Sequence, residues 1–173
     1  DANIQRHAEI AVAKHLKTTL QGLLNKEIKN NKHWPFSNET SSTTRKNTIN
    51  RAIKNSERYR KLTNQGWSKE EILKNFNTKQ NIRIFDWKSK ELVSQKNMTP
   101  IDSILYHKSI LRAGLIAIDP HSGFVKAWVG GINYRHFKYD CSYKSKRQVG
   151  STMKPFVYAA AIESGKITPC TTF

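Results

Sequence analysis

Two short apolar segments joined by a five-residue turn restrict the fold of this chain more than any other feature. Residues 113–118 read AGLIAI and residues 124–131 read FVKAWVGG. Between them, residues 119–123 (DPHSG) are typical of a β-turn, which accounts for the Asp and the His without a catalytic role. The pattern predicts an antiparallel hairpin at the centre of the C-terminal half.

Helical periodicity surrounds this hairpin. Apolar residues recur at helical spacing in three segments, 4–28, about 45–63 and 151–164. A capping pattern at 68–71 and the sequence Thr-Pro-Ile-Asp at 99–102 each indicate the start of a further helix. Residues 81–87 (NIRIFDW) alternate as in a strand, and 88–95 is the expected return strand. Together these elements predict an α+β fold.

The composition changes near residue 98. Residues 1–98 are rich in Asn and Lys and mainly helical in pattern, whereas residues 99–173 are more apolar and mixed. We therefore expect two regions with these bounds. The net charge of +17 is spread over both regions and indicates an anionic surrounding, which could be nucleic acid, a membrane surface or an acidic polymer.

Several classes of site are not expected. No apolar run approaches the roughly 20 residues that a membrane span needs, and the N-terminus does not resemble a signal peptide. The six histidines lack the spacing of metal ligands, so no metal is predicted. Cys141 and Cys170 could pair or remain free thiols, and the sequence leaves both possibilities open.

The strongest candidate for a chemical site is Ser151-Thr152-Met153-Lys154. An S-x-x-K spacing places a hydroxyl and an amine on one face of a helix, so that the amine can take the hydroxyl proton and create a nucleophile. A cation in the first helical turn opposes the helix dipole, which suggests a functional reason for Lys154. We expect this field and burial to favour its neutral, basic form.

The residues around the motif agree with a site at a helix start. Gly150 permits a sharp approach of the chain, and Pro155 prevents a regular helix from beginning much earlier. The backbone N–H of Ser151 then points toward incoming negative charge, as one half of an oxyanion hole does. The alternative is structural: Ser151 as an N-cap and Lys154 as a solvated side chain.

Three segments resemble class A (bifunctional) penicillin-binding proteins in the same order along the chain. Residues 147–161 (RQVGSTMKPFVYAAA) resemble the active-site segment of that family. Residues 117–131 (AIDPHSGFVKAWVGG) resemble the strand-turn-strand before it. Residues 1–16 (DANIQRHAEIAVAKHL) resemble the segment that leads out of the glycosyltransferase domain. Residues 37–98 show no such resemblance.

The resemblance implies a fold and an activity. Residues 99–173 would be the incomplete N-terminal part of a transpeptidase domain of the β-lactamase type, a strand hairpin plus the active-site helix. Residues 1–98 would be the interdomain linker and the first part of that region. Ser151 would be the acylated nucleophile and Lys154 its general base. The substrates would be peptidoglycan stem peptides, with β-lactams as mimics and no cofactor.

The sequence lacks two motifs that complete the family's site, S-x-N and K-T-G. We therefore expect a middle slice of a bifunctional enzyme, inactive alone, with its Met153, Phe156 and Val157 uncovered. The full-length parent would carry a glycosyltransferase domain and an N-terminal membrane anchor, on the periplasmic side of a bacterial inner membrane.

The alternative is a basic interaction module that binds nucleic acid or an acidic partner through the basic-aromatic segment 134–147. Nucleic acid is not the expected partner, because no nucleic-acid-binding fold signature accompanies the charge.

Overall fold

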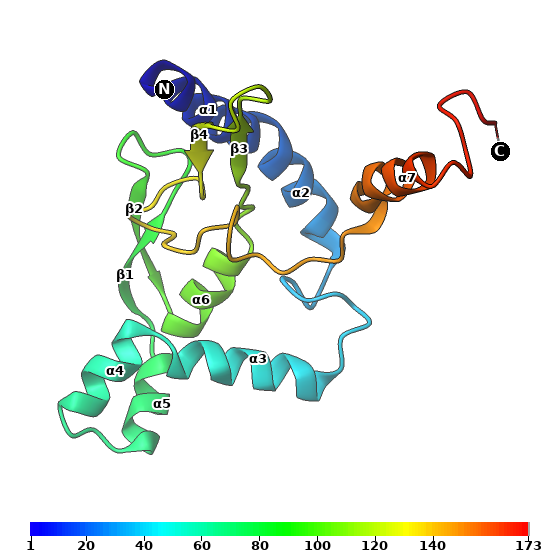
Figure 1. Ribbon diagram of the computed structural model, residues 1–173. Coiled ribbons are helices and arrows are strands. Elements are labelled where there is room, and N and C mark those ends of the chain that lie inside the picture. The colour runs from blue at the N-terminus through cyan, green and yellow to red at the C-terminus, as the bar shows by residue number, and fades with distance from the viewer. Residues whose placement is uncertain (173) are drawn as a thin grey trace. The chain divides into compact units, whose positions relative to one another are not determined.

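The chain divides after Tyr143 into two units, residues 1–143 and 144–173, and the computed structural model describes residues 1–172 (Figure 1). The elements of the first unit are α1 (Ala2–His15), the π-helical η1 (Leu16–Leu20), α2 (Gln21–Glu27), the 3₁₀-helical η2 (Ile28–Asn30), α3 (Ser42–Lys54), α4 (Glu57–Asn64), α5 (Lys69–Asn77), β1 (Gln80–Phe85), β2 (Val93–Met98), α6 (Pro100–Lys108), β3 (Leu115–Ile118) and β4 (Val125–Val129). The elements of the second unit are η3 (Gly150–Met153) and α7 (Lys154–Glu163). Helices and two small antiparallel sheets therefore coexist, as in an α+β protein.

The N-terminal helix begins at a side-chain cap. The Asp1 carboxylate accepts hydrogen bonds from the backbone N–H groups of Asn3 (2.8 Å) and Ile4 (3.1 Å), which have no acceptor inside the helix. The helix predicted over 4–28 forms, and its ladder widens for one π-helical stretch, η1, between α1 and α2. The periodicity predicted the extent of this helix but not the widened turn.

The helix predicted over about 45–63 is two helices, α3 and α4, so its continuity was wrongly predicted. The Ser56 hydroxyl accepts a hydrogen bond from the Tyr59 N–H (3.2 Å) and caps α4. A serine bonded to the backbone ahead of it competes with a continuous helical ladder. Both helices nevertheless pack against one hydrophobic cluster, in which Ile53, Ile72 and Phe76 are buried. Because both helices turn their apolar side chains toward this cluster, the apolar spacing continues from one helix to the next.

Strands β1 and β2 form the first predicted hairpin, but its return strand is Val93–Met98 instead of the expected 88–95, because residues 86–92 form the turn. Ile84 and Phe85 are adjacent and therefore point to opposite faces, and both are buried. Phe85 lies in a cluster with Ile110 and Phe137. Its ring meets that of Phe137 edge to face, with centroids 5.1 Å apart. Protein therefore covers both faces of the hairpin at this end, which strand alternation alone did not predict.

Helix α6 starts where its capping pattern predicts. The Thr99 hydroxyl accepts from the Asp102 N–H (3.0 Å), and the Asp102 carboxylate accepts from the Thr99 N–H (3.2 Å). This reciprocal pair satisfies backbone donors that a helix start leaves without partners. The Tyr106 hydroxyl then donates to the Phe85 carbonyl (2.8 Å), which fixes α6 against β1.

Strands β3 and β4 form the second predicted hairpin, and α1 covers one face of it (Figure 1). Ala8 of α1 is buried with Ala127 and Val129 of β4. The Gln5 side chain donates to the Trp128 carbonyl (3.0 Å) and accepts from the Trp128 N–H (2.7 Å). Contacts thus join residues on both sides of position 98. The division into 1–98 and 99–173 concerns the family's domain organisation and stays a prediction.

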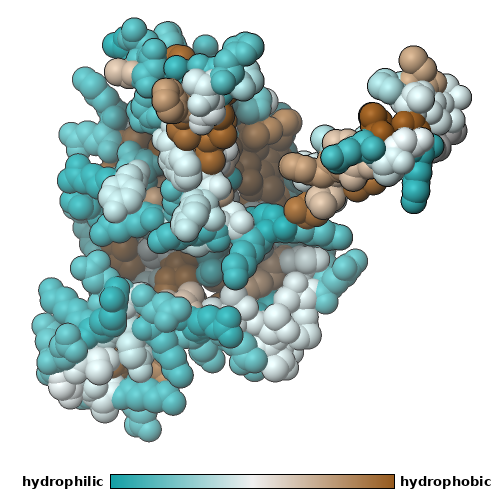
Figure 2. All heavy atoms as spheres, in the orientation of Figure 1, coloured by the Kyte–Doolittle hydropathy of each residue, from teal (hydrophilic) through white to brown (hydrophobic). Residues whose placement is uncertain are grey.

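The second unit contains η3 and then α7, and none of its helical residues is buried. Met153 (48% exposed), Phe156 (69%) and Val157 (57%) present the apolar face that the sequence places on this helix. Figure 2 shows brown, hydrophobic surface along this segment. The helix ends as predicted at Gly165, whose φ of +70° is the left-handed conformation of a helix terminus.

Candidate functional site

The S-x-x-K segment adopts a 3₁₀ turn that leads directly into α7. The Lys154 N–H donates to the Ser151 carbonyl, three residues earlier. Because a 3₁₀-helix has about 3.0 residues per turn, side chains three positions apart are eclipsed along its axis. The backbone therefore places Ser151 and Lys154 on the same side, more directly in line than an α-helix would.

The residues flanking the motif behave as the sequence predicts. Gly150 has a φ of +50°, a conformation that L side chains rarely adopt, and the chain turns there into η3. Pro155 lies in the first turn of α7, where its missing N–H leaves no gap in the ladder. Ser151 occupies the first turn of η3, in which backbone N–H groups have no acceptor within the helix. That placement is compatible with the oxyanion donor predicted for Ser151.

The side chains of the motif are open to solvent. Ser151 and Lys154 are both exposed, so the burial that we expected around the lysine amine is not present. Within residues 1–172, no hydrogen bond joins the Ser151 hydroxyl to the Lys154 amine. The backbone thus aligns the two side chains, and nothing within the described residues of the second unit encloses them. The catalytic roles of both residues stay predictions.

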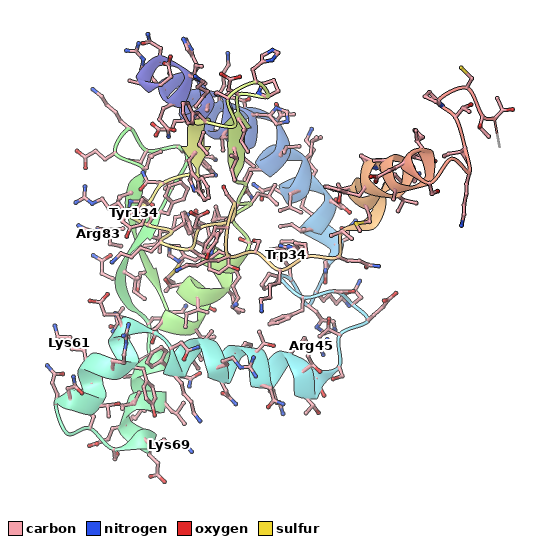
Figure 3. The ribbon with its side chains drawn as sticks, viewed as in Figure 1. Trp34, Arg45, Lys61, Lys69, Arg83 and Tyr134 are labelled. Carbon is pink, nitrogen blue, oxygen red and sulfur yellow. The ribbon has the colours of Figure 1, made fainter. Side chains whose placement is uncertain are left out.

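The basic-aromatic segment divides into one packed residue and several exposed ones. Phe137 is 5% exposed and belongs to the cluster around Phe85. Tyr134 (77%) and Tyr143 (76%) are largely exposed. The cations labelled in Figure 3 are distributed over α3, α4, α5 and β1 instead of lining one groove. This distribution matches the diffuse charge expected from the sequence.

The sequence assigned no role to His107 or His136, although both side chains form contacts in the structure. His107 Nδ1 donates to the Ser103 carbonyl (2.7 Å), and its Nε2 accepts from the Phe85 N–H (3.3 Å). Burial lowers the pKa of His107. Burial, then the positive charges of Arg135, His107 and Arg83, lower the pKa of His136. Sequence spacing could not predict that these histidines and arginines lie close together, because Arg83, His107 and the pair 135–136 come from three separate segments.

The described residues, 1–172, contain no group of three or more His, Cys, Asp or Glu side chains able to hold a metal ion. Cys141 lies in the first unit and Cys170 in the second, and both are free thiols in this structure. None of the helices in residues 1–172 is both long and apolar enough to cross a membrane.

Comparison with known proteins places this architecture in a family. The family model of the penicillin-binding protein middle domain matches residues 22–111, slightly more than half of the chain. The chain therefore belongs to the penicillin-binding protein family. The match includes residues 37–98, for which sequence reasoning found no resemblance.

The curated relatives confirm the resemblance to class A penicillin-binding proteins. Penicillin-binding protein 1A of Vibrio cholerae is 48% identical over 50 residues, 29% of this chain and 6% of that protein. Penicillin-binding protein 2D of Bacillus subtilis is 46% identical over 63 residues, 36% of this chain and 9% of that protein. Penicillin-binding protein 1A of Escherichia coli is 40% identical over 55 residues, 32% of this chain and 6% of that protein. The matches thus span less than a tenth of these relatives. No solved structure matches significantly.

The matched segment has its two ends close together. The side chain of Gln21, just before the segment, donates to the Ser109 carbonyl (3.1 Å) and accepts from the Leu111 N–H (2.9 Å). Helix α1 precedes the segment and packs against β4, which follows it. The middle domain is therefore inserted between two elements that pack on each other.

Proposed function

We propose that this chain is part of a peptidoglycan D,D-transpeptidase that cross-links stem peptides through an acyl-serine intermediate. The observation that carries the proposal is the S-x-x-K motif, whose 3₁₀ backbone places Ser151 and Lys154 on one side at the start of α7. Family membership supports it independently, because the matched segment lies outside the motif.

The proposed reaction has two steps. The Ser151 hydroxyl attacks the carbonyl between two terminal D-alanines while the Lys154 amine accepts its proton. The Ser151 N–H donates to the carbonyl oxygen as negative charge develops there. The bond to the terminal D-alanine breaks and that residue leaves with a proton. An amine of a second stem peptide then attacks the ester, which forms the cross-link and frees Ser151. A β-lactam would acylate the same hydroxyl, and no cofactor is required.

The activity needs more than this pair. A second oxyanion donor, a group for the substrate carboxylate and enclosure of the lysine amine are required, and each contributes to rate. By resemblance these come from the S-x-N and K-T-G motifs, which this sequence does not contain. We propose that they act with this chain in a longer protein of the bacterial cell envelope. That protein would face the periplasm, hold a glycosyltransferase domain and carry a membrane anchor.

Fluorescent penicillin tests the proposal on the longer protein that contains this sequence. We expect labelling to be lost in Ser151→Ala and retained in Ser164→Ala, a serine at the opposite end of α7. Lys154→Met and Lys154→Arg should both lose acylation, since neither side chain accepts a proton, whereas Lys166→Met should not. Peptide mapping that places the adduct on another serine would contradict the assignment.

The isolated chain separates this proposal from the basic-module alternative. We expect no stoichiometric acylation of the 173-residue chain by penicillin in an intact-mass measurement. We also expect only weak, salt-sensitive binding of a short DNA duplex, because a net charge of +17 suffices for nonspecific contacts with phosphates. Submicromolar affinity that survives physiological salt would favour the alternative.

A further inference from the structure

A pocket of about 560 Å³ lies beside the β1–β2 hairpin in the first unit, and none of the residues that line it belongs to the S-x-x-K motif. The residues that line it are Arg83, Glu91, Val93, Ser94, Gln95 and Arg135. Arg83 comes from β1, and Arg135 comes from the connection after β4. In Figure 3, Arg83 points outward from β1, on the side where Tyr134, the neighbour of Arg135, also lies.

The strand register arranges hydrogen-bond donors on this surface. Arg83 pairs directly with Gln95 across the hairpin. The Asn81 side chain donates to the side-chain Oε1 of Gln95 (2.8 Å), so the side-chain NH₂ of Gln95 is the part left to face a ligand. Two guanidinium groups and one amide therefore offer donors to the same pocket.

Both guanidinium groups lack a protein partner. Among the described residues, none forms a hydrogen bond or an ion pair with the guanidinium group of Arg83 or Arg135. Glu91 lines the pocket and forms no ion pair within the part of the chain that the structure describes. Two cations and one acid leave the pocket with a positive charge and unused donors, which is the combination that binds carboxylates and phosphates.

A histidine beside the pocket responds to this positive field. His136 lies next to Arg135 in the chain, and burial first, then the charges of Arg135, His107 and Arg83, lower its pKa. Its ring packs edge to face against Phe85, with centroids 5.4 Å apart, so it is held in place. The two guanidinium groups that line the pocket repel each other, and a bound anion would relieve that repulsion.

We propose that Arg83, Arg135 and Gln95 form a binding site for an oxyanion, a carboxylate or phosphate group carried by a ligand of the first unit. The two guanidinium groups bind the oxyanion through charge-assisted hydrogen bonds, and Gln95 orients it. This site is independent of Ser151, so the failure of either proposal leaves the other intact.

Titration of the 173-residue chain with inorganic phosphate and with N-acetyl-D-alanyl-D-alanine tests the site. We expect saturable shifts of the His136 ring resonances in NMR spectra of the wild-type chain. The double variant Arg83→Gln/Arg135→Gln should bind at least about tenfold more weakly, since two charge-assisted contacts are lost. The tighter of the two probes identifies whether a phosphate or a carboxylate is the preferred group.

The matched control is Lys88→Gln/Lys90→Gln, which removes the same charge from the turn of the same hairpin without touching the pocket. It should bind as the wild type does, and Glu91→Gln should bind more tightly because a competing carboxylate is removed. All four side chains replaced in the double variants are exposed, and circular dichroism verifies folding. Equal weakening in both double variants, or no saturable shift in the wild type, would overturn the proposal.

Discussion

The two hairpins of the first unit differ in how completely they are covered. At the end of β1, Ile84 and Phe85 point to opposite faces and are both buried. In the β3–β4 hairpin, α1 covers one face, whereas Ile116 (39% exposed), Ile118 (58%) and Trp128 (40%) lie on the other. One hairpin is enclosed by its own unit and the other presents apolar side chains to solvent.

This difference follows the boundaries of the family match. The enclosed hairpin lies inside residues 22–111, and the half-covered hairpin lies outside them. Local helices and strands cover most of the enclosed hairpin, and Phe137, which follows the match, completes the cluster around Phe85. The flanking elements bury one face on each other and leave a second apolar face, as α7 also does. Large exposed apolar faces of this kind typically mark surfaces that other structure covers.

The largest expected effect comes from removing a ring from the enclosed hairpin. Phe85→Ala should reduce the free energy of unfolding of the first unit by about 3–5 kcal/mol, because it leaves a cavity among packed aromatic rings. Ile118→Ala, in the half-covered hairpin, should change it by no more than about 0.5 kcal/mol. Urea unfolding measures both, and similar losses would show that the two hairpins are equally enclosed.

Gln21 and Gln5 each form two hydrogen bonds to distant backbone groups, and the two residues differ in burial. Gln21 is 5% exposed and holds the ends of the middle domain together, whereas Gln5 makes the same pair of bonds to Trp128 in an exposed setting. Gln21→Ala should cost about 1–3 kcal/mol, because buried backbone groups lose their partners. Gln5→Ala should cost less, since water can replace its bonds. Thermal unfolding of the two variants tests this order, and the reverse order would contradict it.

The smallest expected effect is a dependence of stability on pH. Burial holds the pKa of His107 below its ordinary value of 6.5, so the unfolded chain binds a proton that the folded chain does not. Stability should therefore be complete above pH 6.5 and decline as the pH falls through that value toward the lowered folded pKa. His136, also lowered, should add to the decline. Unfolding measured from pH 8 to pH 5 should show a shallower slope in His107→Gln, and an unchanged slope would exclude His107 as the source.

Local sequence predicted much of the secondary structure because its signals act over a few residues. The capping pairs Ser68–Glu71 and Thr99–Asp102 form as expected, since each joins groups three residues apart. A turn also forms at 119–123, but the Gly123 N–H bonds to the Asp119 carbonyl four residues earlier (2.8 Å), which is one residue wider than the predicted β-turn. The prediction of a single helix over 45–63 was wrong, because two helices that pack against one core share the same apolar spacing.

The candidate site was also predictable only in part. The S-x-x-K spacing, with Gly150 before it and Pro155 after it, identifies the backbone turn, because those residues constrain their own dihedral angles. The exposure of Lys154 could not be read from the sequence, because it depends on which segments pack against α7. The same limit applies to Arg83 and Arg135, which are 52 positions apart and share a pocket only through the fold.

By itself, the sequence determined the capped helix starts at Ser68 and Thr99, the presence of two hairpins and the position of the S-x-x-K motif. All of these depend on interactions between near neighbours in the chain. Only the tertiary structure decided that α1 packs on β4 and that the Gln21 side chain accepts a hydrogen bond from the Leu111 N–H. These contacts make the middle domain an insertion between α1 and β4. Those contacts join residues about 90 to 120 positions apart, and no local pattern encodes which distant partner a buried face or a side-chain amide will meet.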